Sequence, residues 1–161
     1  MSTYHKSTTN YSNRTVDLLL LQLVEEPKAD AIVHPDVSNQ PHMTTGIEKL
    51  VQRFTLLFLT QVGTIKNCED EGTEFLSALG SGNIYDINTL RAAASAANKA
   101  VFTQIRNEDI DLDTPDDELL ESSVISDLEL DRSKATVYVT ITLTTAAGEK
   151  YTYTTPVTTG V

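Results

Sequence analysis

The amino-acid sequence predicts an α+β fold, in which two or three helices are followed by a small C-terminal antiparallel sheet and preceded by an extended N-terminal arm. Two observations predict it. Apolar residues recur every three or four positions in stretches between residues 46 and 105, and every second position from 137 to 143. A length of 161 residues suits one ordinary domain. We assign residues 1–45 to the arm and 46–161 to the α+β domain.

Residues 16–24 (VDLLLLQLV) are the first ordered element, and their leucine-rich composition fits either a short helix or a buried strand. Pro27 ends either one soon afterwards. From residue 25 to 43 the chain carries Pro27, Pro35 and Pro41, which favour extended and turn conformations. We therefore expect a connecting arm on the surface.

The first helix is predicted from residue 46 to about residue 59. Thr45 and Glu48 have the spacing of a capping box, in which each side chain binds a backbone N–H left open at the helix start. The apolar residues that follow share one helix face. They are Ile47, Leu50, Val51, Phe54, Leu57 and Phe58.

Two further helices are predicted. Thr73 is the expected cap of a short helix whose apolar residues are Phe75, Leu76 and Leu79. Asn88 or Thr89 is the expected cap of a longer helix. Its apolar face comprises Leu90, Ala94, Ala97, Val101 and Ile105.

Residues 108–121 (EDIDLDTPDDELLE) are strongly acidic, carry no basic residue and include a proline. Mutual repulsion of these charges favours a solvated or partner-facing loop. The alternating Asp109, Asp111 and Asp113 suggest a calcium loop, but the turn glycine would fall at Thr114 and the closing glutamate at Leu120. Calcium binding is therefore not expected.

The last third of the chain changes to a two-residue period, which is typical of a strand with one buried face. The apolar positions are Val137, Val139, Ile141 and Leu143. A turn at residues 146–149 and a return strand from Tyr151 complete a hairpin, with residues 124–130 as a third strand paired to its first member.

Composition excludes several classes of function. With 23 acidic against 12 basic residues the net charge is −11, which repels nucleic acid phosphates and anionic lipids. The apolar stretch at 16–24 is too short for a membrane span, and residues 1–14 do not form a signal peptide. The lone Cys68 and the three histidines, His5, His34 and His42, make no metal, cofactor or catalytic pattern. We expect no enzyme, no membrane contact and no nucleic acid partner.

Residues 46–80 combine a glycine, a helix with a Gln-Arg pair, a Leu-Thr end, a further glycine, a short acidic segment, Gly-Thr and a second short helix. This pattern resembles the baseplate wedge and tail sheath-initiator family of contractile-tailed phages and related injection systems. The matching residues are Gly46, Gln52, Arg53, Leu59, Thr60, Gly63, Asp70, Gly72 and Thr73. With the long helix and strands that follow, the likeness spans residues 16–157. The family's Glu-Pro-Arg motif after the long helix is absent, and Arg106 is the residue there that we expect to do part of its work.

The resemblance implies a structural protein of the virion's tail baseplate, assembled in the host cytoplasm, that initiates polymerisation of the sheath. The implied partners are the tail sheath protein, baseplate wedge proteins and tail tube or hub proteins, with six copies in each baseplate ring. Each copy would offer a sheet edge to which an extended sheath segment adds through backbone hydrogen bonds. The residues expected at this edge are Thr136, Tyr138, Thr140, Thr142, Tyr151 and Tyr153. Those expected to contact wedge or tube proteins are Leu19, Leu21, Arg53 and Arg106.

Three alternatives remain at this point. The hairpin is an ordinary meander whose edges the N-terminal arm covers. The chain is a soluble adaptor of the same tail assembly. Third, it is a lysozyme-like glycan hydrolase, which the absence of tryptophan and an aromatic content of 6% disfavour.

Overall fold

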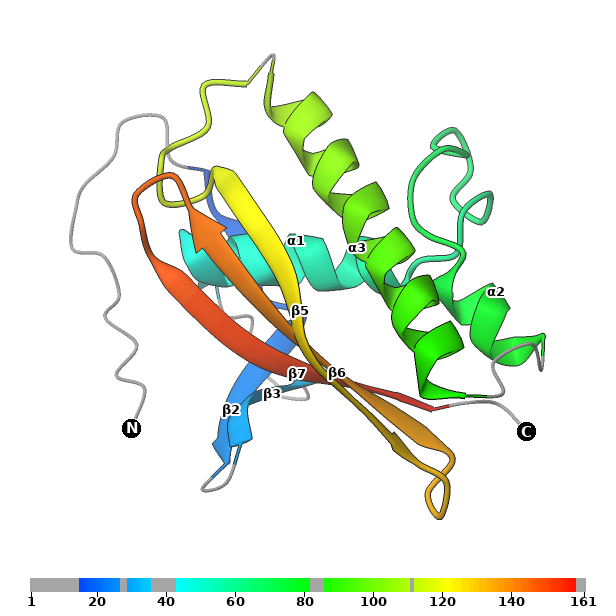
Figure 1. Ribbon diagram of the computed structural model, residues 1–161. Helices are drawn as coiled ribbons and strands as arrows, with labels where there is room; N and C mark the ends of the chain where they lie inside the picture. Colours follow the sequence, from blue (N-terminus) through cyan, green and yellow to red (C-terminus); the bar gives the residue numbers. More distant parts are fainter. Residues whose placement is uncertain (1–14, 27–28, 36–42, 82–85, 111, 159–161) are drawn as a thin grey trace.

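The computed structural model describes residues 15–26, 29–35, 43–81, 86–110 and 112–158. Over these residues the helices are α1 (Ile47–Leu59), α2 (Phe75–Gly80) and α3 (Ile87–Asp109). The strands are β1 (Asp17–Leu18), β2 (Leu21–Glu26), β3 (Ala29–Pro35), β4 (Met43–Thr44), β5 (Leu120–Asp131), β6 (Thr136–Thr145) and β7 (Lys150–Thr158). The predicted α+β fold is confirmed: the helices precede an antiparallel β5-β6-β7 meander and lie on one side of the twisted sheet (Figure 1).

The sheet is larger than the sequence predicted. Its strand order is β2-β3-β7-β6-β5, because the β2–β3 hairpin joins β7 in parallel. This joint consists of the pairs Ala31–Tyr153 and Ile32–Thr154. The stretch from 25 to 43, expected to be only a connecting arm, thus contributes strands as well; residues 27–28 and 36–42 of it lie outside the described residues.

The core lies between the helices and the inner face of the sheet. The apolar faces predicted for α1 and α3 are buried there, together with the alternate residues of β6. Phe58 packs against Phe75 with ring centroids 4.9 Å apart, which joins α1 to α2. Each such large side chain contributes about 1.5–3 kcal/mol by leaving water.

The helix ends differ in part from the prediction. The N-cap of α1 is Gly46 rather than Thr45, and the Gly46 N–H donates to the Glu118 carboxylate at 3.0 Å. The capping-box prediction is therefore wrong, because an acid distant in sequence takes the part expected of Glu48. For α3 the cap is Asp86, just before the predicted Asn88 or Thr89. For α2 the N-cap is Glu74, one residue after the predicted Thr73, although the Thr73 hydroxyl accepts the N–H of Phe75 at 3.2 Å.

Candidate functional site

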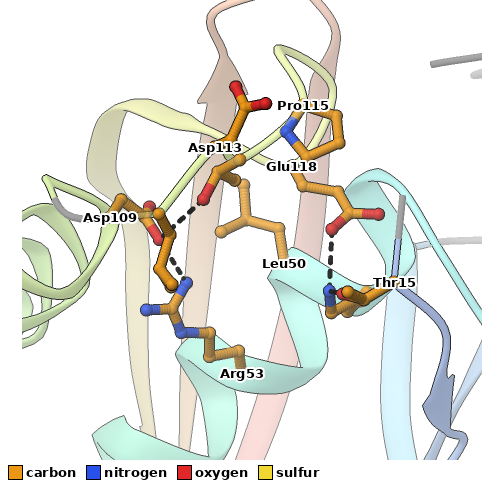
Figure 2. A pocket seen from close by; sticks show the side chains of 10 residues that line it. Thr15, Leu50, Arg53, Asp109, Asp113, Pro115 and Glu118 are labelled. Atoms are coloured by element: carbon orange, nitrogen blue, oxygen red, sulfur yellow. Dashed lines mark hydrogen bonds and ion pairs between the residues drawn. The ribbon is translucent and has the colours of Figure 1, made fainter. Parts of the chain in front are cut away.

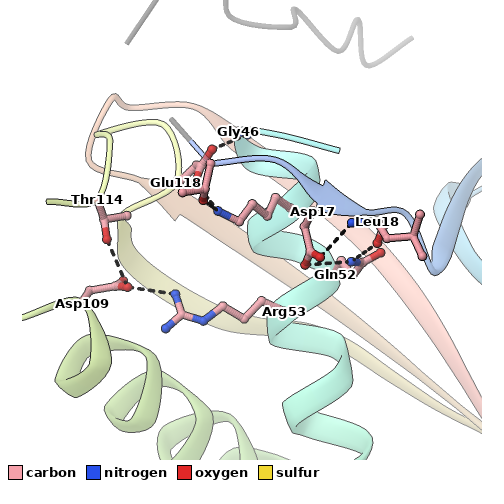
Figure 3. A network of polar contacts seen from close by, with 10 residues as sticks. Asp17, Leu18, Gly46, Gln52, Arg53, Asp109, Thr114 and Glu118 are labelled. Atoms are coloured by element: carbon pink, nitrogen blue, oxygen red, sulfur yellow. Dashed lines mark hydrogen bonds and ion pairs between the residues drawn. The ribbon is translucent and has the colours of Figure 1, made fainter. Parts of the chain in front are cut away.

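The polar face of α1 holds two distant segments of the chain. Gln52 is only 2% exposed, yet all its hydrogen-bonding groups have partners (Figure 3). Its Oε1 accepts the N–H groups of Leu20 and Leu21 at 2.6 and 3.2 Å. Its Nε2 donates to the carbonyl of Leu18 at 2.8 Å and to Asp17 Oδ2 at 3.4 Å. Gln52 therefore fixes residues 17–21 against the helix.

The neighbouring cations of α1 hold the acidic segment. Arg53 donates to Asp109 Oδ1 at 2.9 Å and also pairs with Glu108. Burial alone would lower the pKa of the Arg53 guanidinium, but the hydrogen bonds and charges of Asp109 and Glu108 outweigh it and raise that pKa. Lys49 Nζ lies 2.7 Å from Glu118 Oε2. These contacts tie both ends of the segment to one helix.

The acidic segment is consequently not the wholly solvated loop that its charge predicted. Asp109, Asp117 and Glu118 are buried, whereas Asp113 and Asp116 are exposed. The cause is the pairing of these acids with α1: Arg53 lies beside Asp109 and Lys49 beside Glu118, and these positive charges offset the repulsion among the acids.

A pocket of about 250 Å³ lies between α1 and this segment (Figure 2). Its lining includes Thr15, Lys49, Arg53, Asp109, Leu112, Asp113 and Glu118. The side chain of Asp109 is 2% exposed, and its Oδ2 has no hydrogen-bond partner among the described residues. A buried carboxylate oxygen without a hydrogen-bond partner is energetically unfavourable, so a donor placed beside it would be stabilising.

The predicted strand-addition residues do not lie at a free edge. β6 pairs with β5 on one side and with β7 on the other, so Thr136, Tyr138, Thr140 and Thr142 occupy the middle of the sheet. Their side chains lie half-buried on the face away from the core, where the hydroxyls of Thr140 and Thr154 bond at 2.9 Å. The edge assignment of β6 is therefore contradicted, because topology gives this strand two neighbours.

The two tyrosines of β7 face inward. Tyr151 and Tyr153 stand opposite Leu143 and Ile141 on the core side. Tyr153 is fully buried, and this burial raises the pKa of its hydroxyl far above the ordinary value. Tyr153 therefore lies in the core, on a strand that pairs with β3 on one side and β6 on the other, and not at an edge of the described sheet. Tyr151 is half-buried and packs against the core.

Among the described residues the outer strands of the sheet are β2 and β5, and they differ. On β5, Arg106 donates to the carbonyl of Leu120 at 3.3 Å, and Asn98 donates to that of Ser123 at 3.2 Å. The N–H of Leu128 is held by the neighbouring Asp127 carboxylate at 2.8 Å. Two register shifts also interrupt β5. Such features protect an edge against further pairing.

The residues predicted to contact wedge or tube proteins are mostly engaged within the chain. Leu21 packs against the core, and Leu19 is half-buried. Arg53 is held by the two acids at the end of α3. Arg106 is exposed and caps β5. Sequence reasoning missed the linking roles of Lys49 and Glu118, although the Lys-Leu-Val-Gln-Arg run of α1 opposite an acidic segment was a usable signal.

No protein family model, curated protein or solved structure matches the chain. Among the described residues there is no cluster of three metal-ligating side chains. None of the described helices has the length and apolar character needed to cross a bilayer.

Proposed function

We propose that this chain is a structural subunit whose sheet takes up a strand from another polypeptide, and that it acts at a contractile-tail baseplate by seeding the sheath. The first part rests on the sheet edges. The second part rests on the resemblance in residues 46–80, and the tail sheath protein is the proposed donor of the strand.

The observation that carries the proposal is the asymmetry between the two edges. The backbone of β5 is bound by side chains at Leu120, Ser123 and Leu128 and has two register shifts. On β2, which ends the sheet with no described strand beyond it, Gln52 binds the first N–H and there is one register shift, between Val24 and Glu26. An edge strand presents N–H and C=O groups on its outer side that an extended segment can satisfy. The proposed docking strand is therefore β2, in place of the C-terminal hairpin expected from sequence.

The register of β2 selects the groups that would pair. Leu21 donates its N–H to Gln52, outside the β2–β3 ladder. Because outward and inward backbone groups alternate along an antiparallel strand, the N–H and C=O of Leu23 point to the same outer side. Leu23 is thus the centre of the proposed pairing.

The Gln-Arg pair of the resemblance fits this role. Gln52 binds the N–H groups of Leu20 and Leu21, so the start of β2 is fixed in position against α1. A prepositioned edge binds with a smaller loss of conformational entropy than a mobile one.

The test is Leu23→Pro, with Leu23→Ala as its matched control. Proline removes the outward N–H, whereas alanine keeps it and shortens the same side chain. We expect Leu23→Pro to give tail tubes without sheath in electron micrographs, and Leu23→Ala to give sheathed tails. Far-ultraviolet circular dichroism should match for both. Sheathed tails from a correctly folded Leu23→Pro protein would refute pairing at β2, and sheathed tails from a strain lacking the gene would refute sheath initiation itself.

A further inference from the structure

A stripe of exposed apolar side chains runs along the N-terminal segment. Val16, Leu18 and Leu20 are 58%, 44% and 49% exposed, and Met43 of β4 is 62% exposed. Leu18 pairs directly with Met43, so these two side chains lie side by side, and Val16 and Leu20 flank Leu18 in the chain. We name these four residues the apolar stripe.

The stripe is held in a fixed orientation. Val16 and Leu20 lie two positions on either side of Leu18 of β1, and all three side chains are exposed. Between them, Asp17 is itself exposed but accepts a hydrogen bond from Gln52 at 3.4 Å, Leu19 is half-buried, and Leu21 packs against the core. Four apolar side chains are thus kept in water by a segment anchored behind them, as in surfaces that bind a partner.

The stripe adjoins the pocket on α1. Thr15, next to Val16, lines the pocket and accepts a hydrogen bond from Lys49. Leu112, which also lines the pocket, is 61% exposed. An apolar surface therefore leads into a cavity with carboxylates in its wall.

The charge of the pocket favours a cation. Asp109, Asp113 and Glu118 line it beside Lys49 and Arg53, and Glu108 also pairs with Arg53. Acids thus outnumber bases. The Oδ2 of Asp109, which is buried and has no hydrogen-bond partner among the described residues, adds negative charge beside the pocket. A lysine or arginine side chain supplies both positive charge and donors.

We propose that the stripe and the pocket together bind an extended segment of another protein, with apolar side chains at alternate positions and a lysine or arginine that enters the pocket. A second copy of this chain does not fit, because each copy has a net charge of −11. A stable dimer also needs about 800 Å² on each partner, more than four half-exposed side chains provide. This inference concerns a different surface from β2 and does not depend on the proposed function.

The test uses two fluorescent seven-residue peptides, one alternating leucine with lysine and the other leucine with glutamate. Anisotropy titration of the full chain should show binding of the lysine peptide and none of the glutamate peptide. The double variant Val16→Ser/Leu18→Ser should weaken binding at least tenfold. Val124→Ser is the matched control, because Val124 is 55% exposed and lies on β5; it should leave affinity unchanged.

A second pair of variants tests the pocket. Asp113→Asn should weaken binding of the lysine peptide several-fold and reduce its salt dependence, whereas Asp116→Asn should not. Both residues are exposed acids of the same segment, but only Asp113 lines the pocket. Hydrogen exchange should slow at residues 15–20 when the peptide binds. Equal binding of the two peptides, or equal effects within either pair of variants, would overturn the inference.

Discussion

Replacing Gln52 by methionine should release the N-terminal segment from α1 while leaving the core intact. Methionine has nearly the length of glutamine but no group able to bond the backbone of residues 18–21. The variant therefore removes the hydrogen bonds between the helix and this segment with little change in packing volume.

The size of the effect follows from the hydrogen bonds that Gln52 makes. Three bonds of 2.6, 2.8 and 3.2 Å and one longer contact of 3.4 Å disappear in the variant. At about 1 kcal/mol net for each good bond the sum is about 3 kcal/mol. Water reaches the partly exposed segment and replaces some of these bonds, so we expect a decrease of about 2 kcal/mol in the free energy of unfolding.

Hydrogen exchange locates the change. The amides of Leu20 and Leu21 should exchange faster in Gln52→Met, and urea unfolding should give the decrease in stability. Gln104→Met is the control, because Gln104 holds the backbone of Gly72 through both amide atoms at 3.0 and 2.8 Å. It should expose Gly72 and leave Leu20 protected. A Gln52→Met decrease below about 0.5 kcal/mol, with unchanged exchange at both leucines, would refute this account of the segment.

Three further outcomes are expected. Lys49→Met leaves Glu118 buried without its cation and should cost about 3 kcal/mol in urea unfolding; an unchanged midpoint would show that the pair contributes little. Backbone N–H bonds lower the pKa of Asp86 in the folded state, so its capping contribution is present above the unfolded pKa of about 3.9 and is lost as pH falls through the lower folded pKa. The stability difference between wild type and Asp86→Ala should therefore vanish at strongly acidic pH, and a difference that persists there would argue against a charged cap. Gly72→Ala would bring a Cβ within 2.5 Å of a backbone oxygen and should cost more than Gly63→Ala, by about 1–3 kcal/mol, since both glycines have positive φ but only Gly72 is crowded; equal calorimetric melting temperatures would contradict this.

The helices and the meander were predictable because their signals are local. The spacing from Ile47 to Phe58 fixes which face of α1 is buried, and the alternation along β6 fixes which side of the sheet meets it. The third strand, β5, was correctly predicted to pair with β6, because consecutive strands in a chain often lie side by side in a sheet.

The errors arose where two segments distant in sequence meet. The cap of α1 depends on Glu118, which lies 72 positions from Gly46. The edge of β7 is occupied by β3 through only two residue pairs, which no local pattern marks. The charge run of 108–121 predicted solvation, and the cations of α1 bury part of it instead.

The sequence by itself determined the fold class, the buried faces and the order of elements, because hydrophobic periodicity acts within a few residues of chain. Only the tertiary structure decided which strand ends the sheet, which acids are paired and which leucines stay in water. Those properties depend on neighbours brought together from opposite ends of the chain, and pairing across such distances leaves no period in the sequence.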